Sequence, residues 1–154
     1  MALGRRYHQG NGVRQDYREA ASWYSRAAER GNAEAQYNFG LLNLFGKGVP
    51  QNYTAAAEWF TKAAEQEYAL AQNKLGQLYR RGDGVPKDPQ ASIRWFTFAA
   101  EQGLAEAQFN LGETYLYGRG VPEDVKAAEK WYRSAAAQGH QGAATRLQRL
   151  LPEQ

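Results

Sequence analysis

One block of sequence recurs every 36 residues along this chain, with no insertion or deletion. Trp23 is followed at that step by the other three tryptophans of the chain, Trp59, Trp95 and Trp131. Glycines, valines and paired alanines keep the same step, as in Gly10, Gly46, Gly82 and Gly118. A period of this length is typical of a solenoid, in which each unit buries its apolar face only against its neighbours. The repeat therefore predicts an elongated array of about four units instead of one globular core.

A single unit, residues 33–68, contains two stretches whose apolar residues fall at helical spacing. The first stretch holds Ala33, Ala35, Phe39, Leu42 and Phe45, and the second holds Ala56, Trp59, Phe60, Ala63 and Ala64. Between them lies the sequence Gly-Lys-Gly-Val-Pro, which contains the residues that end helices. Each unit is therefore predicted to be an A helix, a loop and a B helix. The whole chain is predicted to be all-α, with about eight antiparallel helices of roughly 11 to 15 residues.

The ends of the B helices carry their own signals. An Asn or Asp is expected to cap the start of each, at Asp16, Asn52, Asp88 and Asp124. Pro89 follows at the first helical position, where its missing N–H is tolerated. Glycines in the left-handed conformation are expected to close three of these helices, at Gly31, Gly103 and Gly139. Glu67 holds that position in the second unit, where a non-glycine residue is strained by about 1 kcal/mol.

Three glycines lie inside predicted A helices, where glycine is about 1 kcal/mol less favourable than alanine. They are Gly40, Gly76 and Gly112. Such a repeated exception predicts a packing reason, since a missing side chain lets another helix come close. The B-helix tryptophan is expected to pack near this gap, and Trp95 is expected to be buried between helices.

These offsets resemble a known family. The pattern Ala-x-Ala-x-x-x-Phe/Leu-Gly, then Gly-x-Gly-Val-Pro, then Asn/Asp-x-x-x-Ala-x-x-Trp-x-x-x-Ala-Ala runs through residues 33–64 and recurs, with few departures, in the units that follow. It is similar to the Sel-one-like repeat, a relative of the tetratricopeptide repeat. The resemblance implies α/α hairpins wound into a right-handed superhelix whose A helices line the concave side. It also implies a non-enzymatic adaptor role in protein complexes, mostly in bacteria and often in the cell envelope.

The repeat predicts that the whole chain, 1–154, forms a single domain. We expect a partial first repeat at 1–31, repeats at 32–67, 68–103 and 104–139, and a capping helix with a tail at 140–154. The capping helix is expected over 141–151. Because the first A helix lacks its opening turn, Leu3 and Tyr7 are expected to leave apolar surface uncovered. Head-to-tail self-association and a fragment of a longer repeat protein both fit that expectation.

Composition excludes few classes. The net charge is +3, with 16 acidic residues interspersed among 19 basic ones, so no strongly basic nucleic-acid face is indicated. The chain has no cysteine and no long apolar segment of membrane-spanning length. No signal-like apolar stretch appears in residues 1–10. The compartment stays open: the resemblance favours the bacterial periplasm or cell envelope, and the cytoplasm is the alternative.

No catalytic constellation is apparent in the sequence. His8 and His140, the only histidines, fall in opposite terminal units, and no residue set has metal-ligand spacing. The Gly-x-Gly loops lack the strand and the Lys-Ser/Thr pair of a phosphate loop. No cofactor is expected. Some proteins of the resembled family have been described as binding or cleaving peptidoglycan-related or β-lactam compounds, but no residue here carries that role.

A partner-binding groove is the favoured functional hypothesis. In a repeat array, the A-helix positions that vary between units form the free surface. These positions give the candidate partner-binding residues Tyr37, Asn38, Leu41, Phe45, Asn73, Lys74, Gln77, Arg80, Arg81, Phe109, Asn110, Glu113 and Tyr117.

The residue types suggest the chemistry of the partner. Asn can pair with both groups of an extended peptide backbone, and aromatic residues can anchor side chains. Lys74, Arg80 and Arg81 favour an acidic segment or a terminal carboxylate. An envelope assembly factor and a toxin-neutralising immunity protein are both open. RNA binding is the alternative outside protein recognition, and Glu34, Glu106 and Glu113 on the same face argue against it.

Overall fold

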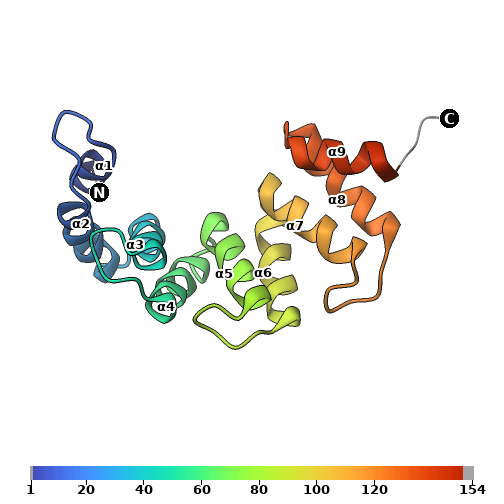
Figure 1. Cartoon of the computed structure of the whole chain (residues 1–154), viewed down its shortest axis with the longest axis horizontal. Helices are drawn as coiled ribbons and strands as arrows, with labels where there is room; N and C mark the ends of the chain where they lie inside the picture. Colours follow the sequence, from blue (N-terminus) through green and yellow to red (C-terminus); the bar gives the residue numbers. More distant parts are fainter. Residues whose placement is uncertain (1, 151–154) are drawn as a thin grey trace.

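The computed structural model describes residues 2–150, which form nine helices and no strand (Figure 1). The helices are α1 (Ala2–Gln9), α2 (Tyr17–Glu29), α3 (Ala33–Phe45), α4 (Tyr53–Ala64), α5 (Ala69–Arg81), α6 (Pro89–Glu101), α7 (Ala105–Leu116), α8 (Val125–Ala137) and α9 (Gln141–Leu150). The predicted all-α repeat fold is confirmed. The helices of the three full units have 12 or 13 residues, whereas α1 has 8 and α9 has 10.

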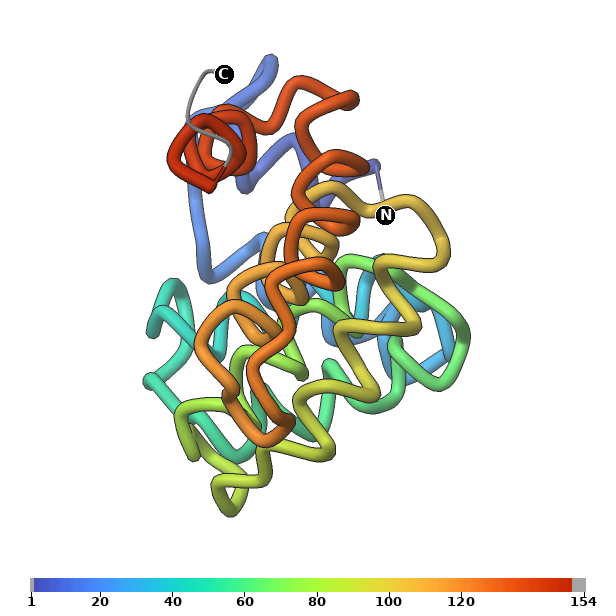
Figure 2. Tube along the Cα trace, turned by 90° about the vertical axis from the view of Figure 1, so that its right-hand side faces the viewer, coloured from blue at the N-terminus to red at the C-terminus, as the bar shows by residue number. Residues whose placement is uncertain are grey.

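The helices form a curved array in which each packs on those before and after it in the chain. The A helices α3, α5 and α7 face the hollow of the curve, and the B helices α4, α6 and α8 lie outside (Figure 1). The first unit and α9 rise on the same side of the central units in both views (Figure 2). The A helices therefore line a concave face, which we call the inner groove.

Side-chain caps start the B helices as the sequence predicts. The side chains of Asp16, Asn52, Asp88 and Asp124 each accept a backbone N–H from the first turn of their helix. Gly31, Gly103 and Gly139 follow the B helices with φ near +85°. Glu67 has φ of +61° and is the only non-glycine residue with positive φ in the described part of the chain. The left-handed residue after the B helix is thus kept in the second unit, although a non-glycine residue is strained in that conformation.

The A-helix glycines admit an aromatic ring, but it is not the tryptophan ring. A Cβ on Gly76 would lie 2.7 Å from the ring of Phe96, and Gly40 and Gly112 stand in the same relation to Phe60 and Tyr132. Phe96 is fully buried, whereas Trp95 is only partly buried at the edge of a core cluster. Trp95 was predicted to be buried and to pack near this gap, but the buried ring that fills the gap belongs to the next residue, Phe96. On an α-helix one position turns the side chain by about 100°, which here separates the core from its margin.

The loop between the A and B helices sets the spacing of neighbouring units. Gly84 has φ of +72°, and a Cβ there would collide with the backbone of Tyr53 in the preceding unit. Gly48 meets the backbone of Tyr17 in the same way. In these two loops, the second glycine of Gly-x-Gly therefore allows the backbones of neighbouring units to approach each other closely.

A ladder of glutamines joins the units and was not foreseen from the sequence. The buried side chains of Gln36, Gln72 and Gln108 each donate to a B-helix carbonyl eight residues earlier, at 3.1 to 3.2 Å. Each also accepts from the glutamine 30 residues later, and these partners are Gln66, Gln102 and Gln138. Because both sets of glutamines keep the step of 36, the repeat itself was the signal.

The first and last helices differ in how well they are covered. Leu3 is 38% exposed, as expected, whereas Tyr7 packs against the core cluster formed by α2 and α3. At the other end, Leu147 and Leu150 of α9 pack against the last core cluster. The predicted capping helix is present, and Leu151 lies outside the described residues.

Candidate functional site: the inner groove

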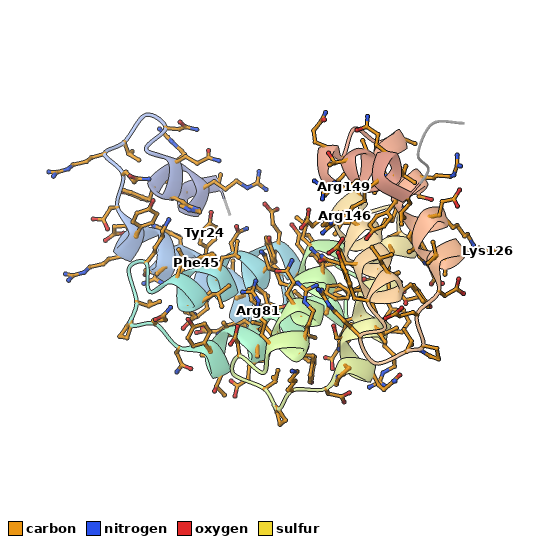
Figure 3. All side chains as sticks on the ribbon, turned by 45° about the vertical axis from the view of Figure 1, so that its right-hand side comes forward. Tyr24, Phe45, Arg81, Lys126, Arg146 and Arg149 are labelled. Atoms are coloured by element: carbon orange, nitrogen blue, oxygen red, sulfur yellow. The ribbon has the colours of Figure 1, made fainter. Side chains whose placement is uncertain are left out.

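Seven of the thirteen candidate residues leave their side chains available at the groove. Phe45 is 58% exposed and Tyr117 is 46% exposed, and Arg81 is exposed as well. The other four are half-buried: Asn38, Leu41, Lys74 and Gln77. Figure 3 labels Phe45 beside α3 and Arg81 in the middle part of the array. The candidate surface is thus concentrated on α3, α5 and the end of α7.

A cavity of about 270 Å³ brings four of these residues together. Phe45 comes from the end of α3, and Lys74, Gln77 and Arg81 come from one face of α5. Asp83, in the loop after α5, lines the same cavity. Lys74 and Gln77 are in contact, with Nζ 3.4 Å from Oε1. An exposed aromatic ring beside two cations can accept both an apolar and an acidic side chain.

Three polar candidates are instead committed to the protein interior. Asn73 and Asn110 are each 4% exposed, and the amide of Asn110 donates to the oxygen of Asn73 at 3.0 Å. Glu113 is 8% exposed and accepts hydrogen bonds from Tyr132 and Arg146. A buried polar group that is already paired is costly to redirect. We therefore assign Asn73, Asn110 and Glu113 to the packing of one unit on the next.

Two aromatic candidates also serve mainly as packing. The ring of Tyr37 lies 5.4 Å from that of Tyr68 and close to Phe60. Phe109 stacks on His140 with ring centroids 4.6 Å apart. Both rings are only partly buried, so an edge of each remains at the groove. Sequence position alone did not separate these contacts between helices from free surface.

Three glutamates of the groove are engaged with other side chains. Glu34 binds Arg5 at 2.5 Å, Glu106 meets His140 at 3.0 Å, and Glu113 binds Arg146 at 2.7 Å. Among residues 2–150, no carboxylate lies within ion-pair distance of Lys74 or Arg81. Among the described residues, Lys74, Arg81 and Asp83 line one cavity without an ion pair, so the unpaired charge there is net positive. Over the whole chain, acids and bases are nearly balanced.

Arg80 points toward the junction of units three and four. Its guanidinium lies over the ring of Phe96, 5.4 Å from the centroid, and donates to the amide oxygen of Asn110 at 3.3 Å. Burial is the main cause of the lowered pKa of Arg80, and the positive charges of Arg119 and Arg81 act in the same direction. The negative charges of Glu113 and Glu106 act in the opposite direction. Arg80 thus differs from Arg81, its exposed neighbour.

Among residues 2–150, no group of three or more side chains is suited to hold a metal ion. In the same residues, none of the helices has both the length and the apolar character needed to cross a bilayer.

The comparisons with known proteins agree with the repeat. The family model for the Sel1 repeat matches four times, at residues 1–32, 33–68, 69–104 and 105–140. A search against curated proteins gave no match. Among solved structures, a protective antigen of uropathogenic Escherichia coli with an SLR fold is 42% identical, with a TM-score of 0.91. That match covers 95% of this chain and 31% of the antigen.

Two other structures share the fold. A Sel1 repeat protein from Oxalobacter formigenes is 38% identical with a TM-score of 0.92, over 96% of this chain and 60% of that protein. Cysteine-rich protein B of Helicobacter pylori is 24% identical with a TM-score of 0.66, over 88% and 98% of the two chains. The present chain thus spans less than two thirds of the first two proteins. With four contiguous family matches over a structure of the same fold, this chain belongs to the Sel1 repeat family.

Proposed function

We propose that this protein is a non-enzymatic adaptor that holds an acidic segment of a protein partner in its inner groove. Members of the Sel1 repeat family are generally protein-interaction modules. The observation that carries the proposal is the charge of the groove: Glu34, Glu106 and Glu113 are paired, whereas Lys74 and Arg81 have no acidic partner among residues 2–150.

The contact surface consists of the side chains that the fold leaves available. Lys74 and Arg81 bind carboxylates of the partner, and Phe45 and Tyr117 contact its apolar side chains. Asn38 and Gln77 are placed to pair with its backbone. Envelope assembly and toxin neutralisation are two settings in which such an adaptor works, and the identity of the partner separates them.

Charge reversal on the two faces tests the proposal. Wild-type protein, a Lys74→Glu/Arg81→Glu variant and a Lys62→Glu/Lys130→Glu variant are used as baits in a lysate of the source organism. The second pair of lysines is exposed on the B helices. Captured proteins are quantified by mass spectrometry, and circular dichroism verifies that all three baits are folded.

The groove variant is expected to lose a specific partner that the B-helix variant keeps. Capture by the wild type should also weaken as salt is raised, because exposed charges are screened over about 8 to 10 Å near physiological ionic strength. Equal loss in both variants would place the partner elsewhere. Loss of capture after nuclease treatment would favour RNA as the ligand of the groove.

A further inference from the structure

A second cavity, of about 520 Å³, lies between units three and four. Its walls come from α5, α6, α7 and the loops that follow α5 and α7. Three cationic side chains line it, those of Arg80, Lys87 and Arg119. Ser92 and Thr114 add two hydroxyl groups, and no carboxylate is among its lining residues. Three positive charges thus line this cavity, and no acidic side chain in its wall balances them.

The repeat supplies an internal comparison for this cavity. Three of its polar residues replace apolar residues found at the same position in the units on either side. Arg80 stands where those units have Leu44 and Leu116, Ser92 where they have Ala56 and Ala128, and Thr114 where they have Leu78 and Leu150. The frame of the solenoid thus does not require these polar groups. Their coincidence around one cavity distinguishes this junction from its neighbours.

Lys87 also departs from the repeat, and Arg119 differs in charge from one of its two equivalents. Lys87 corresponds to Gln51 and Glu123, and Arg119 corresponds to Lys47 and Asp83. The equivalent cavity between units two and three is lined by Leu44, Gln51, Leu78 and Asp83 at these positions. That cavity opens on the groove surface described above. The equivalent cavity between units two and three therefore lacks this concentration of positive charge.

Arg80 is the residue most in need of a counter-ion. It is half-buried, and among residues 2–150 no carboxylate lies within ion-pair distance of its guanidinium. Its only hydrogen bond there is to the neutral amide of Asn110, at 3.3 Å. Taking an unpaired charge out of water is unfavourable unless a partner of opposite sign is supplied. A bound anion would supply that partner.

We propose that this cavity binds a phosphate group, either as free phosphate or on a small phosphorylated molecule. Three cations match a doubly charged anion better than a single carboxylate, and the planar guanidinium groups can each bind two phosphate oxygens. The two hydroxyls already donate to backbone carbonyls, Ser92 to Gly76 at 2.8 Å and Thr114 to Asn110 at 2.8 Å. Their oxygens are therefore free only to accept, and the donors to phosphate are the cations.

This site is separate from the partner-binding proposal, because it requires no protein partner. Titration calorimetry of the whole chain with inorganic phosphate, against sodium chloride of equal ionic strength, tests it. The decisive variants take their residues from neighbouring units: Arg80→Leu, as in Leu44 and Leu116, and Arg119→Asp, as in Asp83. Arg94→Leu is the control, because Arg94 is exposed on α6 and does not line the cavity.

Wild type and Arg94→Leu are expected to bind phosphate alike, whereas Arg80→Leu and Arg119→Asp each weaken binding by about tenfold or more. Arg119 is exposed, so its variant keeps the test valid even if Arg80→Leu fails to fold. Glycerol phosphate binding more tightly than inorganic phosphate would assign the rest of the cavity to an organic group, and equal affinity would assign free phosphate. No binding, equal binding by all four proteins, or equal binding of acetate would overturn the proposal.

Discussion

Arg146 of α9 binds Glu113 of α7 through two hydrogen bonds, Nε to Oε1 at 2.7 Å and Nη2 to Oε2 at 3.2 Å. The same carboxylate accepts from the hydroxyl of Tyr132 on α8 at 2.7 Å. The side chain of Glu113 thus joins the three successive helices α7, α8 and α9 at the end of the array. Its carboxylate is held from both sides, so its role is structural.

Replacing Glu113 is therefore predicted to destabilise the last unit. Glu113→Gln should lower the free energy of unfolding by about 1 to 3 kcal/mol, because hydrogen bonds to a charged group are lost inside the fold. Arg133→Ala breaks the exposed ion pair with Glu129 and should change the free energy of unfolding by less than about 1 kcal/mol. Chemical denaturation of both variants measures the difference. Similar small changes would show that the Glu113 contacts contribute little.

The core rings predict a difference between two adjacent aromatic residues. Phe96→Ala removes a fully buried ring that fills the space beside Gly76, so it should cost about 3 to 5 kcal/mol. Trp95→Ala removes a larger but only partly buried ring and should cost less. Melting temperatures of the two variants test this order. A larger fall in melting temperature for Trp95→Ala than for Phe96→Ala would indicate that the tryptophan is the main core ring.

Glu67 offers a stabilising substitution. Its φ of +61° is strained for any residue with a Cβ, and the equivalent position is glycine in three other units. Glu67→Gly should raise the free energy of unfolding by about 1 kcal/mol. The reciprocal change, Gly103→Ala at φ of +89°, should lower it, although no atom lies within 4 Å of the added Cβ. Denaturation curves in which both substitutions destabilise would contradict this account.

Four tyrosines predict a loss of stability in alkali. The pKa values of Tyr24, Tyr37, Tyr68 and Tyr132 are raised above their ordinary value of 10.0, chiefly by burial. Because the fold favours the neutral rings, their contribution is full below the unfolded pKa and is lost as the pH rises from there toward the folded pKa. Urea unfolding between about pH 8 and about pH 11 should show this decline.

Tyr132→Phe is the informative variant for that decline. The hydrogen bond to Glu113 adds to the effect of burial in raising the pKa of Tyr132. The variant should be less stable at neutral pH, since that hydrogen bond is lost, but its stability should fall less steeply in alkali. Tyr53→Phe, at an exposed ring, is the control and should follow the wild type. If stability falls with pH at the same slope in all three proteins, the decline arises from groups other than Tyr132.

The repeat made most of the fold predictable. Its step of 36 placed the helices, and the Asn and Asp caps and the left-handed residues, Glu67 included, lie where the pattern put them. The error at Trp95 and Phe96 has a physical cause. Both are aromatic and adjacent, and periodicity alone does not decide which of two neighbouring rings meets the A-helix glycine.

The candidate site was less predictable, because it depends on contacts between units. Positions that vary along the repeat include both free surface, such as Arg81, and side chains that bridge helices, such as Asn110. A position that varies between units can therefore hold either a free surface side chain or one that bridges two helices. Only the distances between side chains show which of the two it is. The same distances show that Glu34, Glu106 and Glu113 have side-chain partners, which composition does not reveal.

The most direct test of the adaptor proposal is photocrosslinking from defined positions. A photoreactive phenylalanine analogue replaces Phe45 or Tyr117 at the inner groove, or Phe98 on the B helix α6 as the matched control. All three rings are between 46% and 58% exposed. We predict that the partner forms adducts with the Phe45 and Tyr117 derivatives and not with the Phe98 derivative. Adducts from Phe98 with none from the groove would contradict the account.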